Sequence, residues 1–155
     1  MPTLPEPGLR YFCTLDVALS KLVSVGPAGG ATRRIIPITG GRVHGPNISG
    51  TILPIGADWQ SVLEAGVAEL DARYAFETDD GAVIEIHNFG VRHGPPDVIA
   101  RLAAGEDCPP QSYYMRTMAR LHTGHPDYAW VNTTVFVGTG ARLAQAVQID
   151  LYAVE

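Results

Sequence analysis

The sequence predicts an all-β protein, built as one antiparallel β-barrel of about eight strands in mostly up-and-down order. Gly and Pro together supply 29 residues (17 Gly and 12 Pro), which favours short elements joined by turns. Apolar and polar residues alternate with a period of two along much of the chain. Successive hairpins favour a barrel over a sandwich, and closure removes exposed sheet edges. We expect a single domain over residues 1–155.

The first strand is predicted over residues 9–19, where apolar side chains occupy every second position from Leu9 to Val17. Residues 26–30 have the composition of a turn. A short strand is expected over residues 33–38.

The next segment is expected to turn and bend. Gly40-Gly41 is predicted to be a turn, followed by a strand over residues 42–54. Gly45-Pro46 should bend that strand, because proline cannot donate a hydrogen bond to a ladder. Residues 56–66 are expected to be irregular, or to form a helical turn capped by Asp58.

The clearest element is a hairpin with arms at residues 67–78 and 82–91, joined by a turn at Asp79-Asp80-Gly81. In the first arm Tyr74 falls on one face and Arg73 on the other. Neither face is purely apolar, so we expect polar groups inside the barrel as well as outside. Adjacent residues of a strand face opposite sides, so Arg73 and Tyr74 cannot both line one pocket unless a bulge intervenes.

The C-terminal half contains the one predicted helix, residues 97–104, with proline before it and Gly105 after it. Strands are expected over residues 112–121, 129–137 and 143–154. The turns between them are placed at residues 124–127 and 138–140.

Composition excludes some classes of function. A formal charge of −5 argues against a nucleic-acid surface. No stretch resembles a signal peptide or a membrane span, so we expect a cytoplasmic protein. Cys13 and Cys108 are expected to be free thiols. The single lysine, Lys21, stands against ten arginines, and arginine is the better residue for holding carboxylates in fixed geometry.

No pattern points to a metal, a cofactor or a nucleophile. The five histidines are scattered, and His122 and His125 alone are close, in a turn that suits a ligand pair poorly. Gly138-Thr139-Gly140 opens no helix and is not a phosphate loop. We therefore expect neither metal nor cofactor.

Acid/base chemistry has better support. Asp58 lies beside Trp59, and an aromatic surface can favour the protonated form of a carboxyl group; the alternative is an aspartate that caps a turn. Inward arginines could bind a carboxylate or an enolate, and their alternative role is in structural ion pairs. Candidates on strands or strand ends are Arg73, Arg92, Arg116, Asn88 and Asn132.

Several blocks resemble one family in order along the chain. They are Gly40-Gly41-Arg42, Gly45-Pro46, Gly56-Ala57-Asp58-Trp59, Asp71-Ala72-Arg73-Tyr74, Thr78-Asp79-Asp80-Gly81, Asn88, Gly90, Tyr114-Met115-Arg116-Thr117, Tyr128-Ala129-Trp130-Val131-Asn132 and Phe136-Val137-Gly138. The chain resembles the domain of unknown function 3237 family from about Phe12 to Val154. The resemblance implies an antiparallel β-barrel without an established general activity. It also suggests cofactor-free ring closure or addition to an alkene, the role suggested for some fungal relatives.

Carried over by position, the family's recurring polar residues are Arg42, Asp58, Arg73, Tyr74, Asn88, Arg116 and Asn132. The family often has Phe-Glu-Thr where this chain has Leu121-His122-Thr123. His122 therefore either replaces a glutamate with a group that titrates nearer neutrality or marks a lost activity.

The leading hypothesis is a cofactor-free cyclase or isomerase acting on an aromatic or polyketide-like substrate inside the barrel. The residues expected to be catalytic are Asp58, Arg73 and His122, and those expected to bind the ligand are Arg42, Trp59, Tyr74, Asn88, Arg116, Trp130 and Asn132. The alternatives are a non-catalytic carrier or sensor of a small hydrophobic ligand and a structural oligomer subunit. A small organic ligand and a homo-oligomer are the expected partners, and nucleic acid and membrane are not.

Overall fold

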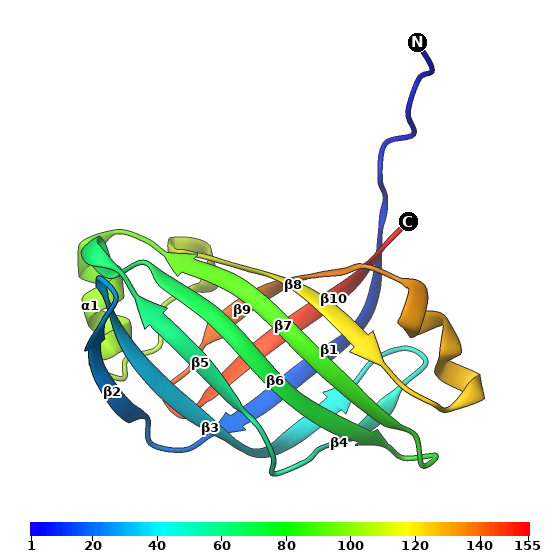
Figure 1. The fold of residues 1–155 in the computed structure, drawn as a ribbon, viewed down its shortest axis with the longest axis horizontal. Coiled ribbons are helices and arrows are strands. Elements are labelled where there is room, and N and C mark those ends of the chain that lie inside the picture. Colours follow the sequence, from blue (N-terminus) through cyan, green and yellow to red (C-terminus); the bar gives the residue numbers. More distant parts are fainter.

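The computed structural model describes residues 1–155 as one ten-stranded sheet that closes into an eight-stranded antiparallel barrel with two extra strands (Figure 1). The strands are β1 (Leu9–Leu19), β2 (Val23–Ala28), β3 (Ala31–His44), β4 (Ser49–Ile52), β5 (Ala57–Val62), β6 (Ala68–Thr78), β7 (Val83–His93), β8 (Tyr114–His122), β9 (Phe136–Arg142) and β10 (Ala146–Val154). The helices are α1 (Pro96–Ala103) and the 3₁₀ segments η1 (Glu64–Gly66), η2 (Pro110–Ser112) and η3 (Pro126–Thr133).

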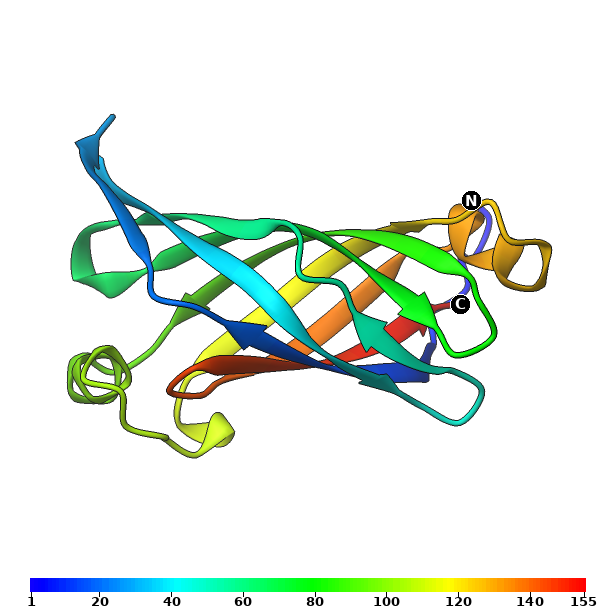
Figure 2. The same cartoon turned by 90° about the horizontal axis from the view of Figure 1, so that it is seen from below.

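The barrel closes where β1 pairs with β3. From β1 the order runs through β10, β9, β8 and β7 to β6, so the second half of the barrel is a run of successive hairpins. Between β6 and β3 the wall consists of two short strands, β4 and β5, which each pair with both neighbours. The hairpin of β2 with β3 extends beyond the barrel rim (Figure 2). The predicted barrel of about eight mostly up-and-down strands is confirmed.

The predicted central hairpin is present as β6 and β7, in antiparallel register from Ala68–Arg92 to Glu77–Val83. The first strand has the predicted bounds, and the predicted helix is α1. Pro96 occupies its first position, where a missing N–H group costs nothing.

Several local predictions are wrong. Gly40-Gly41 lies within β3 and is not a turn. Gly41 has a φ of 134°, and a Cβ built on it would lie 1.9 Å from the carbonyl oxygen of Asp16 on β1. Glycine is therefore required here because two backbones approach each other where the barrel closes.

The other errors concern segments with ambiguous patterns. Residues 57–62, expected to be irregular, form strand β5. Residues 126–133 form η3, so the strand expected from residue 129 begins only at Phe136. Residues 138–140, expected to be a turn, lie inside β9, where the buried Gly138 and Gly140 face the side chains of β8 and β10.

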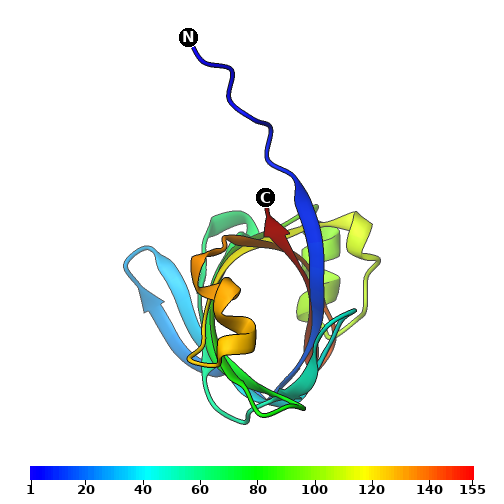
Figure 3. The ribbon, with the colours of Figure 1, turned by 90° about the vertical axis from the view of Figure 1, so that its right-hand side faces the viewer.

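The two halves of the barrel interior differ. At one end of the barrel η3 lies at the edge of the opening (Figure 3). Its Trp130 packs edge-on against Phe12, with the two ring centroids 5.0 Å apart, and lies near Phe136. Large buried side chains fill the adjoining interior, among them Phe76, Ile84, Ile86, Leu121, Phe136 and Leu151. The opposite half, beside α1, is less densely filled and contains the cavity described below. No helix is both long and apolar enough to cross a membrane.

Candidate functional site

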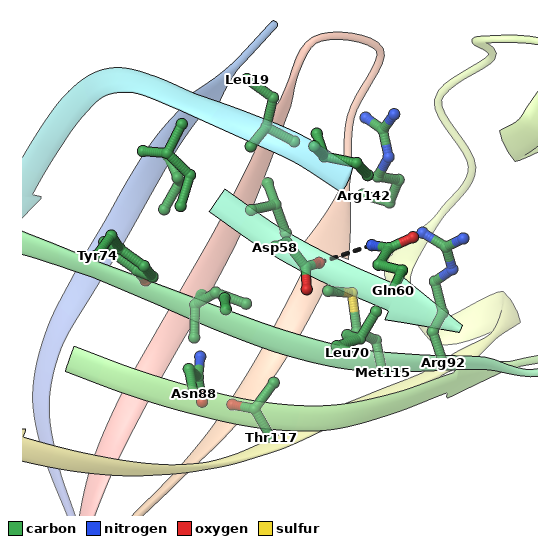
Figure 4. Close-up of a pocket in the computed structure, with 16 residues that line it drawn as sticks. Leu19, Asp58, Gln60, Leu70, Tyr74, Asn88, Arg92, Met115, Thr117 and Arg142 are labelled. Atoms are coloured by element: carbon green, nitrogen blue, oxygen red, sulfur yellow. Dashed lines mark hydrogen bonds between the residues drawn. The ribbon is translucent and has the colours of Figure 1, made fainter. Parts of the chain in front are cut away.

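A cavity occupies the half of the barrel next to α1 (Figure 4). It encloses about 530 Å³ of empty space including its mouth, and about 40 Å³ of this admits the centre of a water molecule. Its lining residues are Val17, Leu19, Ile36, Ile38, Asp58, Gln60, Leu70, Ala72, Tyr74, Asn88, Arg92, Met115, Thr117, Arg142, Val147 and Ile149. The inner cavity is thus narrow, with room for roughly three water molecules or a slim organic group.

Strand alternation directs the polar groups inward. On β5 the inward positions are Asp58 and Gln60, whereas Trp59 between them is 38% exposed on the outside. On β7 the inward positions include Asn88 and Arg92, which are both buried. The barrel wall thereby places a carboxyl group, two amides and a guanidinium among apolar side chains.

Asp58 is held by two donors. Its Oδ1 accepts a hydrogen bond of 2.9 Å from the backbone N–H of Asp71, and its Oδ2 accepts one of 2.6 Å from the Gln60 side-chain amide. Arg34 Nε donates to Gln60 Oε1 at 2.8 Å, which orients the glutamine so that its NH₂ group faces Asp58. The carboxyl group is therefore fixed, and each oxygen retains a lone pair for another partner.

Burial decides the acidity of Asp58. Removal from water raises the pKa of this carboxyl group, and the hydrogen bonds from Gln60 and Asp71 and the charge of Arg92 offset only part of that effect. A raised pKa suits a group that must both give and take a proton. Burial also raises the pKa of Tyr74, so its phenol stays neutral and can donate a hydrogen bond.

Three buried side-chain atoms have no hydrogen-bond partner in the protein, and all three belong to residues that line this cavity. They are Asn88 Oδ1, Arg92 Nε and Thr117 Oγ1. Leaving such a group unpaired costs about 1–3 kcal/mol, so native proteins seldom do so without a reason. Because they lie on the cavity wall, these three groups are available to hydrogen-bond to molecules inside the cavity.

Of the residues proposed from sequence, the structure brings Asp58, Tyr74 and Asn88 together in the cavity. Arg73 lies outside it, exposed, with a nitrogen 3.0 Å from Nδ1 of His87, whose Nε2 is 2.8 Å from Asp71. The alternation of β6 thus separates Arg73 from Tyr74 without a bulge.

The other proposed residues also lie away from the cavity. Arg116 and His122 are exposed on the outer face of β8, and Arg42 is exposed near Thr51 and Asp79.

Trp59, Trp130 and Asn132 have positions that suit structural roles. Trp59 is on the outer face of β5, and Trp130 belongs to the capped end. The Asn132 side chain accepts a hydrogen bond from the N–H of Thr123 and donates one to its carbonyl, which fastens η3 to the end of β8. These residues therefore play no part in the site considered below.

Sequence reasoning did not select Gln60, Thr117, Arg34 or Arg142, and it listed Arg92 only among the strand arginines. The alternation of the strands could have predicted that two of these residues point inward, because Arg92 shares a face with Asn88 and Thr117 shares a face with Met115. Gln60 could not be found in this way because β5 was not predicted.

The structure contains no group of three or more His, Cys, Asp or Glu side chains able to hold a metal ion. Both cysteines are buried and unpaired, as predicted.

Residues 7–154 match the model of a family described as "Protein of unknown function (DUF3237)". The chain belongs to the DUF3237 family. The resemblance seen in the sequence blocks is thereby confirmed. Among curated proteins, a UPF0311 protein of Rhodopseudomonas palustris is 46% identical over 153 residues, which cover 99% of this chain and 98% of the relative. A UPF0311 protein of Bradyrhizobium diazoefficiens is 40% identical over the same shares of the two chains.

Solved structures agree with the DUF3237 fold. A protein of unknown function from Rhodopseudomonas palustris superposes with a TM-score of 0.95 at 44% identity, covering 98% of this chain and all of the other. A β-barrel-like protein from Acinetobacter baumannii has a TM-score of 0.88 at 39% identity, with full coverage of both chains. A Penicillium herquei protein described as an enzyme has a TM-score of 0.74 at 18% identity, again with full coverage, and at that identity the likeness shows the fold alone.

Proposed function

We propose that the barrel binds a small amphipathic organic molecule in its cavity and that Asp58 transfers a proton on that molecule without a cofactor. The observation that carries the proposal is the cavity wall itself, where one desolvated carboxyl group and three unpaired buried polar atoms face an otherwise largely apolar space. Apolar clefts with a few convergent polar groups and a perturbed acid are typical of small-molecule sites.

The chemistry that fits is an isomerisation. In a ring closure, the acid form of Asp58 gives its proton to an alkene or enone carbon of the substrate. A hydroxyl group of the same substrate then forms the new C–O bond and returns its proton to Asp58. Atoms and electrons balance without an oxidant, a reductant or water, so the groups on the cavity wall suffice.

The neighbouring groups support this role. Tyr74 and Asn88 can hydrogen-bond to a substrate carbonyl or hydroxyl group, and the Asn88 oxygen has no partner within the protein. Arg34 holds the Gln60 side chain in place, and Gln60 in turn donates a hydrogen bond that keeps Asp58 in one orientation. Since the inner cavity is narrow, the reacting end of the substrate enters it and the remainder lies toward the mouth.

The test is a turnover screen of phenolic alkenes and polyketide-like enones, with products identified by mass spectrometry and NMR. Asp58→Asn keeps the size of the side chain but removes the titrating group, and we expect it to lower the rate about 10²- to 10⁴-fold. Asp16→Asn, on the outside of β1, is the matched control and should retain the wild-type rate. Equal turnover by wild type and Asp58→Asn would refute the role of Asp58.

A carrier or sensor of small hydrophobic molecules is the second candidate, favoured by the largely apolar lining and by the presence of a single carboxyl group on the wall. It predicts that a ligand bound by the purified protein is recovered unchanged. It also predicts that the wild type and Asp58→Asn both bind that ligand and that neither forms a product from it.

A further inference from the structure

A wider opening lies outside the cavity, between the end of the barrel and α1. We call it the vestibule; it encloses about 1430 Å³ of empty space including its open side. It shares Leu19, Ile36, Arg92 and Arg142 with the cavity, so the two spaces adjoin each other. Helix α1 contributes Ile99, Leu102 and Ala103 to the lining of the vestibule.

Positive charge is concentrated around the vestibule. Lys21, Arg34, Arg92 and Arg142 line it, and no acidic residue does. Asp58, inside the cavity, is the one carboxyl group on the lining of either space. In a chain whose formal net charge is −5, four of the eleven lysine and arginine residues line this one opening.

The three arginines have no carboxylate partner. None of them forms an ion pair in the protein, and their side-chain hydrogen bonds go to neutral acceptors: Arg34 to Gln60, and Arg142 to the carbonyl groups of Leu143 and Ala146. Arg92 is 7% exposed, and its Nε has no partner at all. A buried guanidinium nitrogen without a partner is costly for a folded protein, and a bound anion would reduce that cost.

The charges also act on one another. Burial, followed by the positive charges of Arg34 and Arg142, lowers the pKa of Arg92 to about 10, against smaller opposing effects of Tyr113 and Asp58. Burial and Arg34 likewise lower the pKa of Arg142, where Tyr113 and Asp107 act in the opposite direction. Burial is the largest cause of the lowered pKa in both residues, and repulsion by neighbouring arginines acts in the same direction.

We propose that the ligand of this barrel is an organic anion, an unsaturated or aromatic carboxylate, whose carboxylate binds Arg34, Arg92 and Arg142 while its unsaturated part enters the cavity. Arginine binds carboxylates through two parallel hydrogen bonds, which fixes their orientation. The inference rests on the proposed function for its choice of the cavity as the ligand site.

The spacing of the groups narrows the class further. One glutamine amide separates Arg34 from Asp58, with hydrogen bonds of 2.8 Å and 2.6 Å on its two sides. When the carboxylate of the ligand binds these arginines, the ligand atoms a few bonds from that carboxylate lie beside Asp58. The reacting double bond or ring of the ligand must then be close to its carboxylate.

The experiment measures binding by isothermal titration calorimetry at neutral pH with cinnamate and with cinnamamide, which differs in lacking the charge. We expect cinnamate to bind at least about tenfold more tightly, because hydrogen bonds to a charged group are stronger than those to a neutral amide. Arg142→Gln and Arg92→Gln should each remove most of that preference. Arg142 is the safer variant because it is only partly buried, and circular dichroism checks that both variants fold.

Arg33→Gln is the matched control. Arg33 adjoins Arg34 on β3 but donates to Ser61 and does not line either space, so its loss should leave both affinities unchanged. The proposal is overturned if cinnamamide binds as tightly as cinnamate, or if inorganic phosphate binds as tightly as cinnamate. It is also overturned if benzoate, cinnamate and 2-naphthoate all fail to bind at concentrations up to about 10 mM.

Asp58→Asn separates this proposal from the proposed function. We expect Asp58→Asn to retain the preference for cinnamate, because Asp58 is not the anion-binding group. If the preference depends on the arginines but turnover does not depend on Asp58, only the acid/base role fails. If turnover of neutral substrates depends on Asp58 and the arginine variants have no effect, only the anion site fails.

Discussion

Two buried threonines should respond in opposite directions to the same substitution. Thr117 and Thr78 are 7% and 3% exposed. The Thr117 hydroxyl faces the cavity wall without a partner, whereas the Thr78 hydroxyl accepts from the N–H of Ala82 at 2.8 Å and donates to its carbonyl at 3.3 Å. Valine nearly preserves the shape of threonine and removes the hydroxyl group, so the pair isolates the effect of the hydrogen bonds.

The magnitudes follow from these contacts. An unpaired buried hydroxyl costs about 1–3 kcal/mol, so Thr117→Val should raise the free energy of unfolding by about 1 kcal/mol once imperfect packing of the extra methyl group is deducted. Thr78→Val leaves a buried N–H group unpaired and should lower the free energy of unfolding by about 1–3 kcal/mol. The valine at position 117 should also weaken ligand binding about three- to tenfold, since one neutral hydrogen bond is lost.

Urea unfolding followed by circular dichroism measures both free energies, provided that the slope with urea is the same in each variant. The reasoning would be refuted if Thr117→Val were destabilised as much as Thr78→Val, because the Thr117 hydroxyl would then have a partner that the structure does not show. It would also be refuted if Thr117→Val bound ligand as tightly as the wild type.

Three further predictions concern the fold. Gly41→Ala should lower the free energy of unfolding by about 3 kcal/mol in urea, because its Cβ meets the backbone of β1, whereas Gly29→Ala, in an open turn, should cost about 1 kcal/mol. Phe136→Ala, at the end of the barrel beside η3, should lower the free energy of unfolding by about 3–5 kcal/mol without changing ligand affinity. Burial raises the pKa of Cys13 from 9.0 to about 12, so Ellman's reagent should modify this thiol only after unfolding. The fold should lose stability as the pH rises above 9, because the unfolded chain releases this proton and the folded chain retains it.

The barrel was predictable where one face of a strand is consistently apolar. The hairpin of β6 and β7 shows this, since Tyr74, Phe76, Ile84 and Ile86 all point inward and the register follows from the alternation. The family blocks and the run of hairpins then led to the same closed architecture.

Local errors arose where glycines were interpreted as turns. Gly41 is required by the close approach of a neighbouring backbone, whereas Gly140 lies against the ends of the Met115 and Ile149 side chains. Such a requirement depends on residues distant in the sequence, so composition alone cannot reveal it.

The prediction of Asp58 was based on a neighbour that does not act on it. Trp59 faces the opposite side of β5, and the carboxyl group is desolvated by the barrel interior instead. Gln60 and Arg34 complete its surroundings from two strands whose pairing the sequence does not state. The alternation along a strand identifies the residues of that strand that point inward. Which inward residues of different strands lie next to one another depends on how the strands are paired in the barrel.

A crystal structure of the protein soaked with cinnamate tests the central claim most directly. We predict electron density for the ligand in the cavity, with its carboxylate on Arg92 and Arg142 and its double bond beside Asp58, and with Asn88 or Thr117 newly hydrogen-bonded. A cavity without ligand, or cinnamate bound only on the outer apolar surface around Phe89, would contradict the account.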